Sequence, residues 1–322
     1  MRVAVIGAGI AGLGCAEALR ANGHEPVLFE KARGIGGRMS TRRVAVCGDM
    51  LTFDHGATHF TARSSAFRAL VLDWQARGLA APWPRAGLHA WVGTPTMNAP
   101  LKDMARAHDV HLATTITAIT RQGQSWAVHS ERQRFGPFEA VVLAIPAEQA
   151  APLLSLHDFD MARSAMSVTS RPVWSAMFAF SERISSLPDF LRASSPLVYA
   201  VRGNALPGRS GAEHWVVQAD WTWSEAHLAH DSQSISSDLL ALFSVLAGGA
   251  TPPPVFADAQ RWRFAQPSGS ELGHLWNGEI GLGACGDWLT HGFVEHAWRS
   301  GRALADAISG SNTDRHPVVG QS

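Results

Sequence analysis

The strongest constraint on how this chain can fold is a short apolar segment at its start that runs into three closely spaced glycines. Residues 3–6 read Val-Ala-Val-Ile, a run of strand length, and Gly7, Gly9 and Gly12 follow in the pattern G-x-G-x-x-G. The next residues predict a helix over residues 13–21. A strand, this glycine pattern and a helix in direct succession indicate a Rossmann-like unit that binds a dinucleotide.

Each glycine of this turn has a predicted task. Gly7 permits the tight turn, Gly9 lets backbone N–H groups approach a pyrophosphate, and Gly12 allows the helix to pack closely on the sheet. Ile10 and Ala11 lie in the same turn, and we expect both to contact the cofactor. The glycine pattern alone is weak evidence, but here a strand and a helix flank it in the required order.

An acidic residue completes the fingerprint at the end of the second predicted strand. Glu30 is predicted to accept hydrogen bonds from a ribose. Lys31 follows it, and a G-G-R pattern ends on Gly37 and Arg38, whose guanidinium is suited to phosphate. The two motifs together resemble the flavin-dependent amine oxidase superfamily. The resemblance implies FAD as the cofactor, with these residues and Met39 beside it.

A related element lies near the C-terminus, where residues 281–301 read GLGACGDWLTHGFVEHAWRSG. An apolar strand ends on Gly286 and Asp287, and helical spacing begins at about residue 293. In the superfamily that the chain resembles, such an element closes over the flavin. The resemblance implies that Asp287 holds the ribityl or phosphate region and that the helix directs its positive end at the flavin. The other implied contacts are Gly286, Val294, Glu295 and Ala297.

Longer stretches narrow the resemblance. Four stretches resemble the bacterial renalase-like branch of the superfamily. They are FDHGATHFTAR (53–63), WVGTPTMNAPLKDMA (91–105), RWRFAQPSG (261–269) and ACGDWLTHGFVEHAWRSG (284–301). This branch implies a flavoprotein that oxidises the 2- and 6-dihydro isomers of NAD(P)H to NAD(P)+. It also implies that the electrons pass to O2 and form H2O2.

The same resemblance assigns residues to the site. We expect His59 and Trp288 to be the catalytic pocket walls. At Thr58 and His59 the branch more often has glutamine and tyrosine, which leaves the substrate-side wall open. Further implied cofactor contacts are Gly56, Ala57, Thr58 and Ile116. An arginine near the entrance is expected to bind the substrate phosphates, with three open alternatives: Arg63, Arg261 and Arg299.

The small number of lysines and tyrosines bears on the choice between an amine and a dihydronicotinamide as the substrate. The lysines are Lys31 and Lys102, and Tyr199 is the sole tyrosine. Many amine oxidases of the superfamily use a lysine near the flavin and two tyrosines around the amine, so this composition disfavours an amine substrate. A dihydronicotinamide is already a hydride donor and needs no general base. An amine oxidase or desaturase is the first alternative, and a flavin-binding protein without redox chemistry is the second.

Charge and cysteine content argue against other classes. Lys plus Arg and Asp plus Glu both number 27, so we expect no nucleic-acid or membrane partner. Three cysteines without zinc spacing indicate a cytoplasmic protein. Cys285 lies near the predicted flavin element, but the superfamily's covalent cysteine lies elsewhere, so we expect non-covalent FAD. His227 and His230 lack a third ligand, and no metal site is predicted. Oligomeric state is not predicted.

The predicted fold class is α/β, with a Rossmann-like FAD-binding domain interleaved with an antiparallel-sheet substrate domain. The FAD-binding domain is assigned to residues 1–61, 100–155 and 273–322, and the substrate domain to 62–99 and 156–272. Further helices are expected over residues 64–77, 101–108, 235–247 and from 293. Further strands are expected over residues 26–29, 140–145, 172–180, 197–202, 213–221 and 255–264. The polar tail, 309–322, is expected to be disordered.

Overall fold

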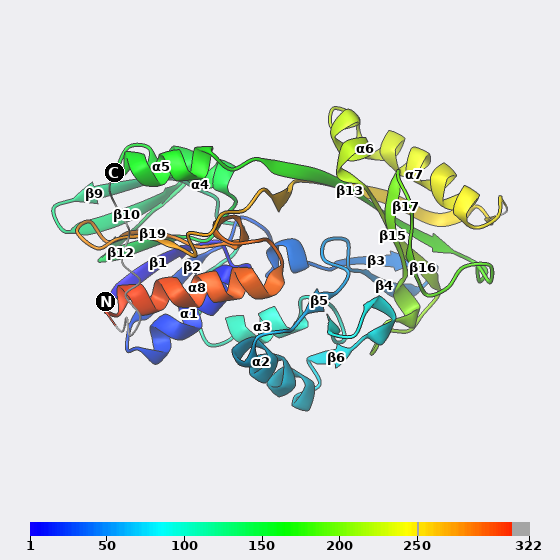
Figure 1. The fold of residues 1–322 in the computed structure, drawn as a ribbon, viewed down its shortest axis with the longest axis horizontal. Coiled ribbons are helices and arrows are strands. Elements are labelled where there is room, and N and C mark those ends of the chain that lie inside the picture. Colours follow the sequence, from blue (N-terminus) through cyan, green and yellow to red (C-terminus); the bar gives the residue numbers. More distant parts are fainter. Residues whose placement is uncertain (250, 311–322) are drawn as a thin grey trace.

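The computed structural model describes residues 1–249 and 251–310 and is built around two large sheets (Figure 1). The first sheet has six strands in the order β18-β19-β12-β1-β2-β8, and all neighbours are parallel except β18 and β19. In that order the strands span Leu275–Asn277, Leu282–Ala284, Ala140–Leu143, Arg2–Ile6, Glu25–Phe29 and Asp109–His111. The predicted Rossmann-like unit is confirmed.

Helices cover both faces of this sheet (Figure 1). α1 (Ile10–Ala21) and α8 (Val294–Ile308) lie side by side on one face, whereas α4 (Ala147–Leu154) and α5 (Phe159–Met166) cover the other. α1 and α8 approach so closely that a Cβ atom on Gly301 would lie 2.1 Å from the carbonyl oxygen of Ala11. No larger residue fits at this crossing without moving a helix.

Side-chain alternation along β1 divides the buried residues into two cores. Val3 and Val5 pack with α1 and α8 in what we call the α1/α8 core. Ala4 and Ile6 pack with α4 and α5 in the α4/α5 core. Burial on both faces is the reason that β1 reads as one continuous apolar run in the sequence.

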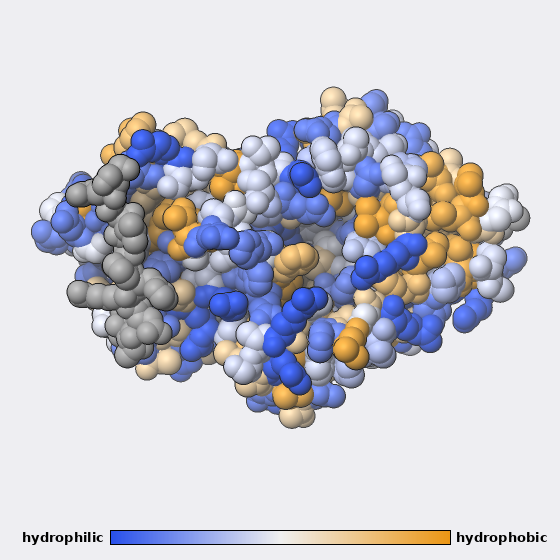
Figure 2. Space-filling view, in the orientation of Figure 1, coloured by the Kyte–Doolittle hydropathy of each residue, from blue (hydrophilic) through white to orange (hydrophobic). Residues whose placement is uncertain are grey.

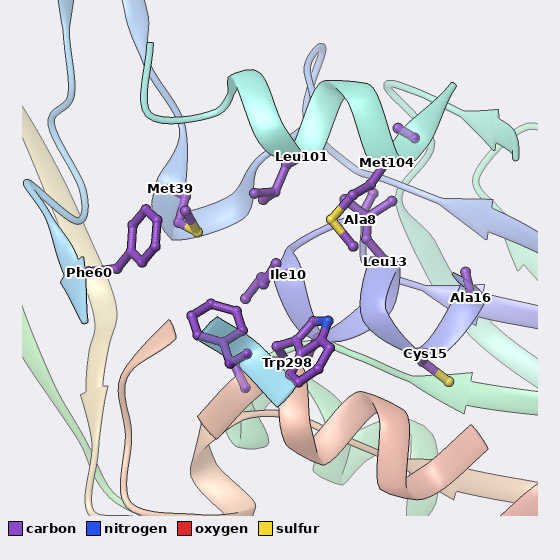
Figure 3. Packing of buried hydrophobic residues seen from close by; sticks show 14 of the residues in the cluster. Ala8, Ile10, Leu13, Cys15, Ala16, Met39, Phe60, Leu101, Met104 and Trp298 are labelled. Carbon is purple, nitrogen blue, oxygen red and sulfur yellow. The ribbon is translucent and has the colours of Figure 1, made fainter. Parts of the chain in front are cut away.

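The chain between residues 60 and 105 packs on the α1/α8 core. It forms β5 (Phe60–Thr61), α2 (Ser65–Ala76), β6 (Ala80–Pro82), β7 (Ala90–Gly93) and α3 (Ala99–Ala105). Figure 3 shows Trp298 of α8 close to α1, with Leu101 and Met104 of α3 across α1 from it and Phe60 of β5 nearby. This segment therefore shares its core with the cofactor-binding motif.

The second large sheet is antiparallel, with the order β14-β15-β16-β13-β17, and lies at the right in Figure 1. Its strands span Phe190–Arg192, Leu197–Arg202, Glu213–Ala219, Ser170–Phe180 and Pro254–Pro267. α6 (Trp221–Ala226) and α7 (Ser232–Leu246) pack on one face, and the hairpin of β3 (Arg42–Val46) and β4 (Asp49–Phe53) packs on the other. Hydrophobic surface residues gather over this region in Figure 2. The predicted antiparallel sheet is confirmed.

A small sheet of β9 (Ile116–Gln122), β10 (Ser125–Ser130) and β11 (Arg134–Phe138) completes the α4/α5 side. Among the described helices, none is both long and apolar enough to cross a membrane. Residues 311–322 of the expected disordered tail, and of the last assigned segment, lie outside the described residues.

Several predicted boundaries were wrong by two or three residues. The strand expected over 213–221 ends at Ala219, because the Asp220 carboxylate accepts a hydrogen bond of 2.7 Å from the Trp223 N–H and caps α6. The strand expected to reach residue 145 ends at Leu143. The helix expected over 101–108 is α3, which begins at Ala99 and ends at Ala105. Gln218 of β16 also contacts the loop after β4, since its Nε2 donates to the Gly56 carbonyl at 2.6 Å.

Candidate functional site

The glycine turn before α1 is closed on its inner side and open on its outer side. Gly7 has φ +106°, and a Cβ there would lie 2.4 Å from the Ala144 carbonyl oxygen. A Cβ on Gly12 would lie 2.0 Å from the Gly7 carbonyl oxygen, whereas a Cβ on Gly9 would meet no atom within 4 Å. No side chain caps the first turn of α1, which includes Ile10 and Ala11. Its backbone N–H groups are therefore available to an anion.

The acid at the end of β2 is held firmly beside this turn. Glu30 is 6% exposed, and its two carboxylate oxygens accept hydrogen bonds from the Ala8 N–H at 2.9 Å and the Ala32 N–H at 2.8 Å. Lys31 points away, because its Nζ donates to Gln149 Oε1 of α4 at 3.1 Å. Glu30 thus fixes both the turn and its own loop, whereas Lys31 sits at the exposed edge.

The G-G-R segment lies against the glycine turn and joins distant parts of the chain. A Cβ on Gly37, where φ is +52°, would lie 3.4 Å from Gly9 Cα. The Arg38 guanidinium contacts Asp287 in a bidentate ion pair with N–O distances of 2.5 and 2.7 Å, and it donates to the Ala265 carbonyl at 3.0 Å. Burial opposes the charge of Arg38, but Asp287 outweighs burial and raises the pKa of the guanidinium. Met39 is buried in the α1/α8 core.

Arg38 and Asp287 were predicted as two separate cofactor contacts, and the structure brings them together. Gly286, with φ +152°, precedes the aspartate and donates its N–H to Ser300 Oγ of α8 at 2.9 Å. Arg38 therefore joins the G-G-R segment to β17 and to the short segment that precedes α8. Sequence reasoning missed the pair because the two residues lie at opposite ends of the chain.

The loop that contacts the backbone of Arg38 contains Gly56, Ala57 and Thr58. A Cβ on Gly56 would lie 2.0 Å from the Arg38 carbonyl oxygen, and the Ala57 N–H donates to that oxygen at 2.8 Å. Thr58 Oγ1 lies 3.1 Å from His59 Nδ1. Because Gln218 of β16 also donates to the Gly56 carbonyl, the loop is held by the G-G-R segment on one side and by the antiparallel sheet on the other.

His59 stands among aromatic side chains that we call the aromatic enclosure: His59, Trp83, Phe190 and Tyr199. The His59 ring centroid lies 6.2 Å from Trp83, 5.7 Å from Phe190 and 6.0 Å from Tyr199. Phe190 stacks on Tyr199 at 5.7 Å. Burial and the nearby Arg192 guanidinium lower the pKa of His59 from 6.5 to about 4, so its imidazole is neutral at pH 7.

The first turn of α8 is bound to the segment that follows β5. Phe293 precedes the helix with φ +70°, an uncommon conformation for a non-glycine residue, and its side chain is 74% exposed. Glu295 accepts hydrogen bonds from the N–H groups of Arg63 and Ser64, both at 2.8 Å. Burial favours protonation of Glu295, but these bonds outweigh it and lower its pKa. Val294 is half-buried and Ala297 is buried against α1.

His59 and Trp288, which were expected to share one pocket, pack against different cores. Trp288 is 2% exposed, belongs to the α4/α5 core and donates its indole N–H to the Ile145 carbonyl at 3.1 Å. His59 instead packs with residues of the α1/α8 side. The Trp288 side chain is therefore packed in the α4/α5 core, and the catalytic roles expected of Trp288 and His59 stay predictions. Ile116 likewise begins β9 as part of the α4/α5 core.

Comparison with known families decides the class. A model described as flavin containing amine oxidoreductase matches residues 85–309, more than half of the chain. The chain belongs to this family. A second model, described as an NAD(P)-binding Rossmann-like domain, matches residues 5–74. The predicted superfamily is confirmed and a flavin-containing oxidoreductase is shown, whereas the renalase-like branch stays a prediction.

One curated protein and two solved structures illustrate what the chain is similar to. The chain is 45% identical over 58 residues to a 4,4'-diapophytoene desaturase of Staphylococcus aureus (strain Newman), an alignment that covers 18% of this chain and only 11% of that protein. A putrescine oxidase bound to putrescine has a TM-score of 0.70 at 14% identity, covering 96% of this chain and 99% of the other. A CLA-producing fatty acid isomerase from P. acnes has a TM-score of 0.68 at 12% identity, covering 95% and 98%. At such low sequence identity, the TM-scores of the two structures show a shared fold and nothing further.

Sequence reasoning missed three members of the aromatic enclosure: Trp83, Phe190 and Tyr199. Tyr199 was noted as the sole tyrosine, yet its position opposite His59 was not foreseen. The short strands β14 and β15 pair through Phe190 with Val201 and Arg192 with Tyr199. Only this pairing brings the two aromatic rings together, and no spacing in the sequence could have indicated it.

Proposed function

We propose that the chain is an FAD-dependent oxidase that converts 2- and 6-dihydro isomers of NAD(P)H to NAD(P)+ with O2 as electron acceptor, forming H2O2. The observation that carries the proposal is the aromatic enclosure, in which a neutral His59 faces three aromatic rings beside the Arg192 cation. The resemblance of several segments to the renalase-like branch supports the same conclusion.

The residues present fit FAD as the cofactor. The open side of the glycine turn would receive the diphosphate, Glu30 would hold the ribose, and the Arg38–Asp287 pair would lie by the chain between diphosphate and flavin. When bound, FAD accepts two electrons with a proton and returns them to O2. Cys285 is fully buried with its thiol against Cys15, which supports non-covalent binding. Acid precipitation should release the yellow colour into the supernatant; colour kept in the pellet would contradict non-covalent binding.

The enclosure suits a flat, neutral ring better than an amine. Aromatic side chains can stack on a dihydronicotinamide and exclude water from it. The positive charge of Arg192, which already lowers the pKa of His59, opposes entry of an alkylammonium ion and favours release of the pyridinium product. Lys31 binds Gln149, and Lys102 lies on α3, so neither lysine belongs to the enclosure.

The test compares the turnover of several candidate substrates with O2 present as the electron acceptor. The purified protein is mixed in turn with 6-dihydro-NAD, 2-dihydro-NAD, ordinary NADH and a panel of primary amines, and H2O2 and NAD+ are both measured. We expect one H2O2 per NAD+ with the two isomers and much slower turnover with NADH and amines. Peroxide formation with an amine alone would instead make the protein an amine oxidase built around His59 and tryptophan.

A further inference from the structure

Beside the start of α8 lies a group of basic side chains that we call the α8 cluster: Arg63, His291, His296 and Arg299. The His296 ring centroid lies 5.9 Å from that of His291 and 6.1 Å from that of Phe293. Arg63 is tied to the same turn because its N–H donates to Glu295 Oε2 at 2.8 Å. After burial, the charges of Arg299, His291 and Arg63 help to lower the pKa of His296, with Glu295 opposing them.

The periodicity of two elements aims this cluster outward. Phe293, His296 and Arg299 recur every three residues on the side of α8 away from the buried residues Ala297 and Trp298. Along residues 59–63 burial alternates, with Phe60 and Ala62 at 3% and 1% exposure while Arg63 is exposed. Alternation places Arg63 on the same side of this extended segment as His59.

Among the described residues, the two guanidinium groups of the cluster are not paired with an acid, although Glu295 lies at the same turn. Within the described ranges, the guanidinium groups of Arg63 and Arg299 form no ion pair and no hydrogen bond. Both oxygens of Glu295 are used by the backbone N–H groups of Arg63 and Ser64. His296 Nδ1 is buried and lacks a hydrogen-bond partner. A site of this composition favours an anion with several oxygens.

We propose that the α8 cluster binds the diphosphate of a dinucleotide substrate whose nicotinamide ring occupies the aromatic enclosure. This inference rests on the proposed function and names its phosphate site. His59 and Arg63 are four residues apart on an extended segment, so their Cα atoms are separated by at most about 13 Å. One ribose lies between the ring and the diphosphate of such a substrate, so both groups can be bound together.

The structure also decides among the three arginines that the sequence left open. Arg261 is engaged elsewhere, since its guanidinium lies 5.6 Å from the Trp174 ring and donates to the Leu228 carbonyl at 2.5 Å. Arg63 and Arg299 stand together beside His296. Arg261 is therefore a matched control for Arg63 and Arg299.

The kinetic test uses two probes that differ in phosphate. Arg63→Gln, Arg299→Gln and Arg261→Gln are assayed with 6-dihydro-NAD and with the 6-dihydro form of 1-methylnicotinamide, which has no phosphate. Arg63→Gln and Arg299→Gln should each raise KM for the dinucleotide about tenfold with kcat nearly unchanged, because each removes a charged hydrogen-bond donor. KM for the phosphate-free probe, and both constants of Arg261→Gln, should stay at wild-type values. Equal effects on the two probes, or none on either, would overturn the phosphate site.

A binding measurement keeps this inference separate from the proposed function. NMR titration follows His296 of the holoprotein with and without inorganic pyrophosphate. The pKa of His296 should rise when pyrophosphate is present, and the rise should be lost in the Arg63→Gln/Arg299→Gln double variant, with the double variant's melting temperature as a check on folding. An unmoved His296 would contradict the inference even if dihydronicotinamides are oxidised. If pyrophosphate moves His296 but neither isomer is oxidised, the phosphate site stands and the proposed reaction fails.

Discussion

Two groups of arginines in this molecule have opposite surroundings. Arg38, Arg202 and Arg209 are paired with acids, and the last two are almost fully buried. Arg63, Arg192 and Arg299 are exposed, and within the described part of the chain none of them forms an ion pair. The first group holds segments of the fold together, whereas the second leaves positive charge at the candidate substrate site. The same residue type therefore serves the fold in one place and can serve a ligand in another.

The largest effect is expected where a buried arginine loses its acid. Asp54 pairs with Arg209, and their side chains are 2% and 1% exposed. Asp54 also accepts from Thr41 Oγ1 and from the Met97 N–H, at 2.5 and 3.1 Å. Asp54→Ala should lower the free energy of unfolding by about 3 to 5 kcal/mol, because the guanidinium stays buried without a counter-charge. Urea unfolding followed by fluorescence measures this loss.

A surface pair provides the control for that comparison. Arg77 contacts Asp73 at 2.8 Å, with side chains 44% and 57% exposed. Asp73→Ala should change the free energy of unfolding by less than about 1 kcal/mol, since solvent screens the pair and Asp103 also contacts Arg77. Similar losses in Asp54→Ala and Asp73→Ala would contradict the distinction between buried and exposed arginines.

The next effect is an acid-dependent loss of stability. His55 and His59 both have pKa values lowered from 6.5 to about 4, first by burial and then by Arg42 and Arg192 respectively. Because the folded state holds these imidazoles neutral, their contribution is fully present above pH 6.5 and is lost as the pH falls through 4. The loss should be about 3 kcal/mol for each histidine.

Urea unfolding at a series of pH values tests this sign, with His59→Phe as the comparison. The variant should lose less stability than the wild type between pH 6.5 and 4. Arg192→Gln should move the pKa of His59 upward, which NMR titration can follow. An unchanged pKa in Arg192→Gln would show that Arg192 contributes no positive potential at the enclosure.

The smallest effect on stability should accompany a large effect on the cofactor. A Cβ at Gly9 meets no protein atom within 4 Å and its φ is −81°, so Gly9→Ala should alter the unfolding free energy of the apoprotein by less than about 1 kcal/mol. The added methyl group should nevertheless lower flavin occupancy of the purified protein, because it would enter the space predicted for the diphosphate. Flavin absorbance per mole of protein measures the occupancy.

Gly34→Ala is the matched control, because a Cβ there also meets no atom within 4 Å and its backbone is not in the left-handed region. It should keep wild-type flavin content. Full flavin content in Gly9→Ala would place the diphosphate away from this turn.

The two large sheets and the glycine turn could be predicted because they depend on local patterns. Gly7, Gly9 and Gly12 stand between a strand and a helix in the order that the fold requires, and the structure keeps that order. Boundaries failed where a single side chain decided them, as with Asp220 at the start of α6. The antiparallel sheet was predicted from segments of alternating apolar and polar residues, although β13 is buried on both of its faces.

The candidate site was harder to predict because its contacts join distant segments. Nothing in the residues around His59 indicated Phe190 or Tyr199, which arrive through the pairing of β14 with β15. Adjacency to Asp287 in the sequence also did not indicate that the Trp288 side chain packs in the α4/α5 core. Nor could the sequence distinguish Arg63 and Arg299 from Arg261, since the hydrogen bond of Arg261 to Leu228 exists only in the folded chain.

The central claim is that this flavin-containing oxidoreductase takes its electrons from a dihydronicotinamide. The most direct measurement is a stopped-flow experiment without oxygen, in which the purified protein is mixed with 6-dihydro-NAD, with NADH or with amines. The account predicts that the isomer alone removes the visible flavin band rapidly, with one NAD+ formed per flavin. Bleaching by an amine with no response to either dihydro isomer would contradict it.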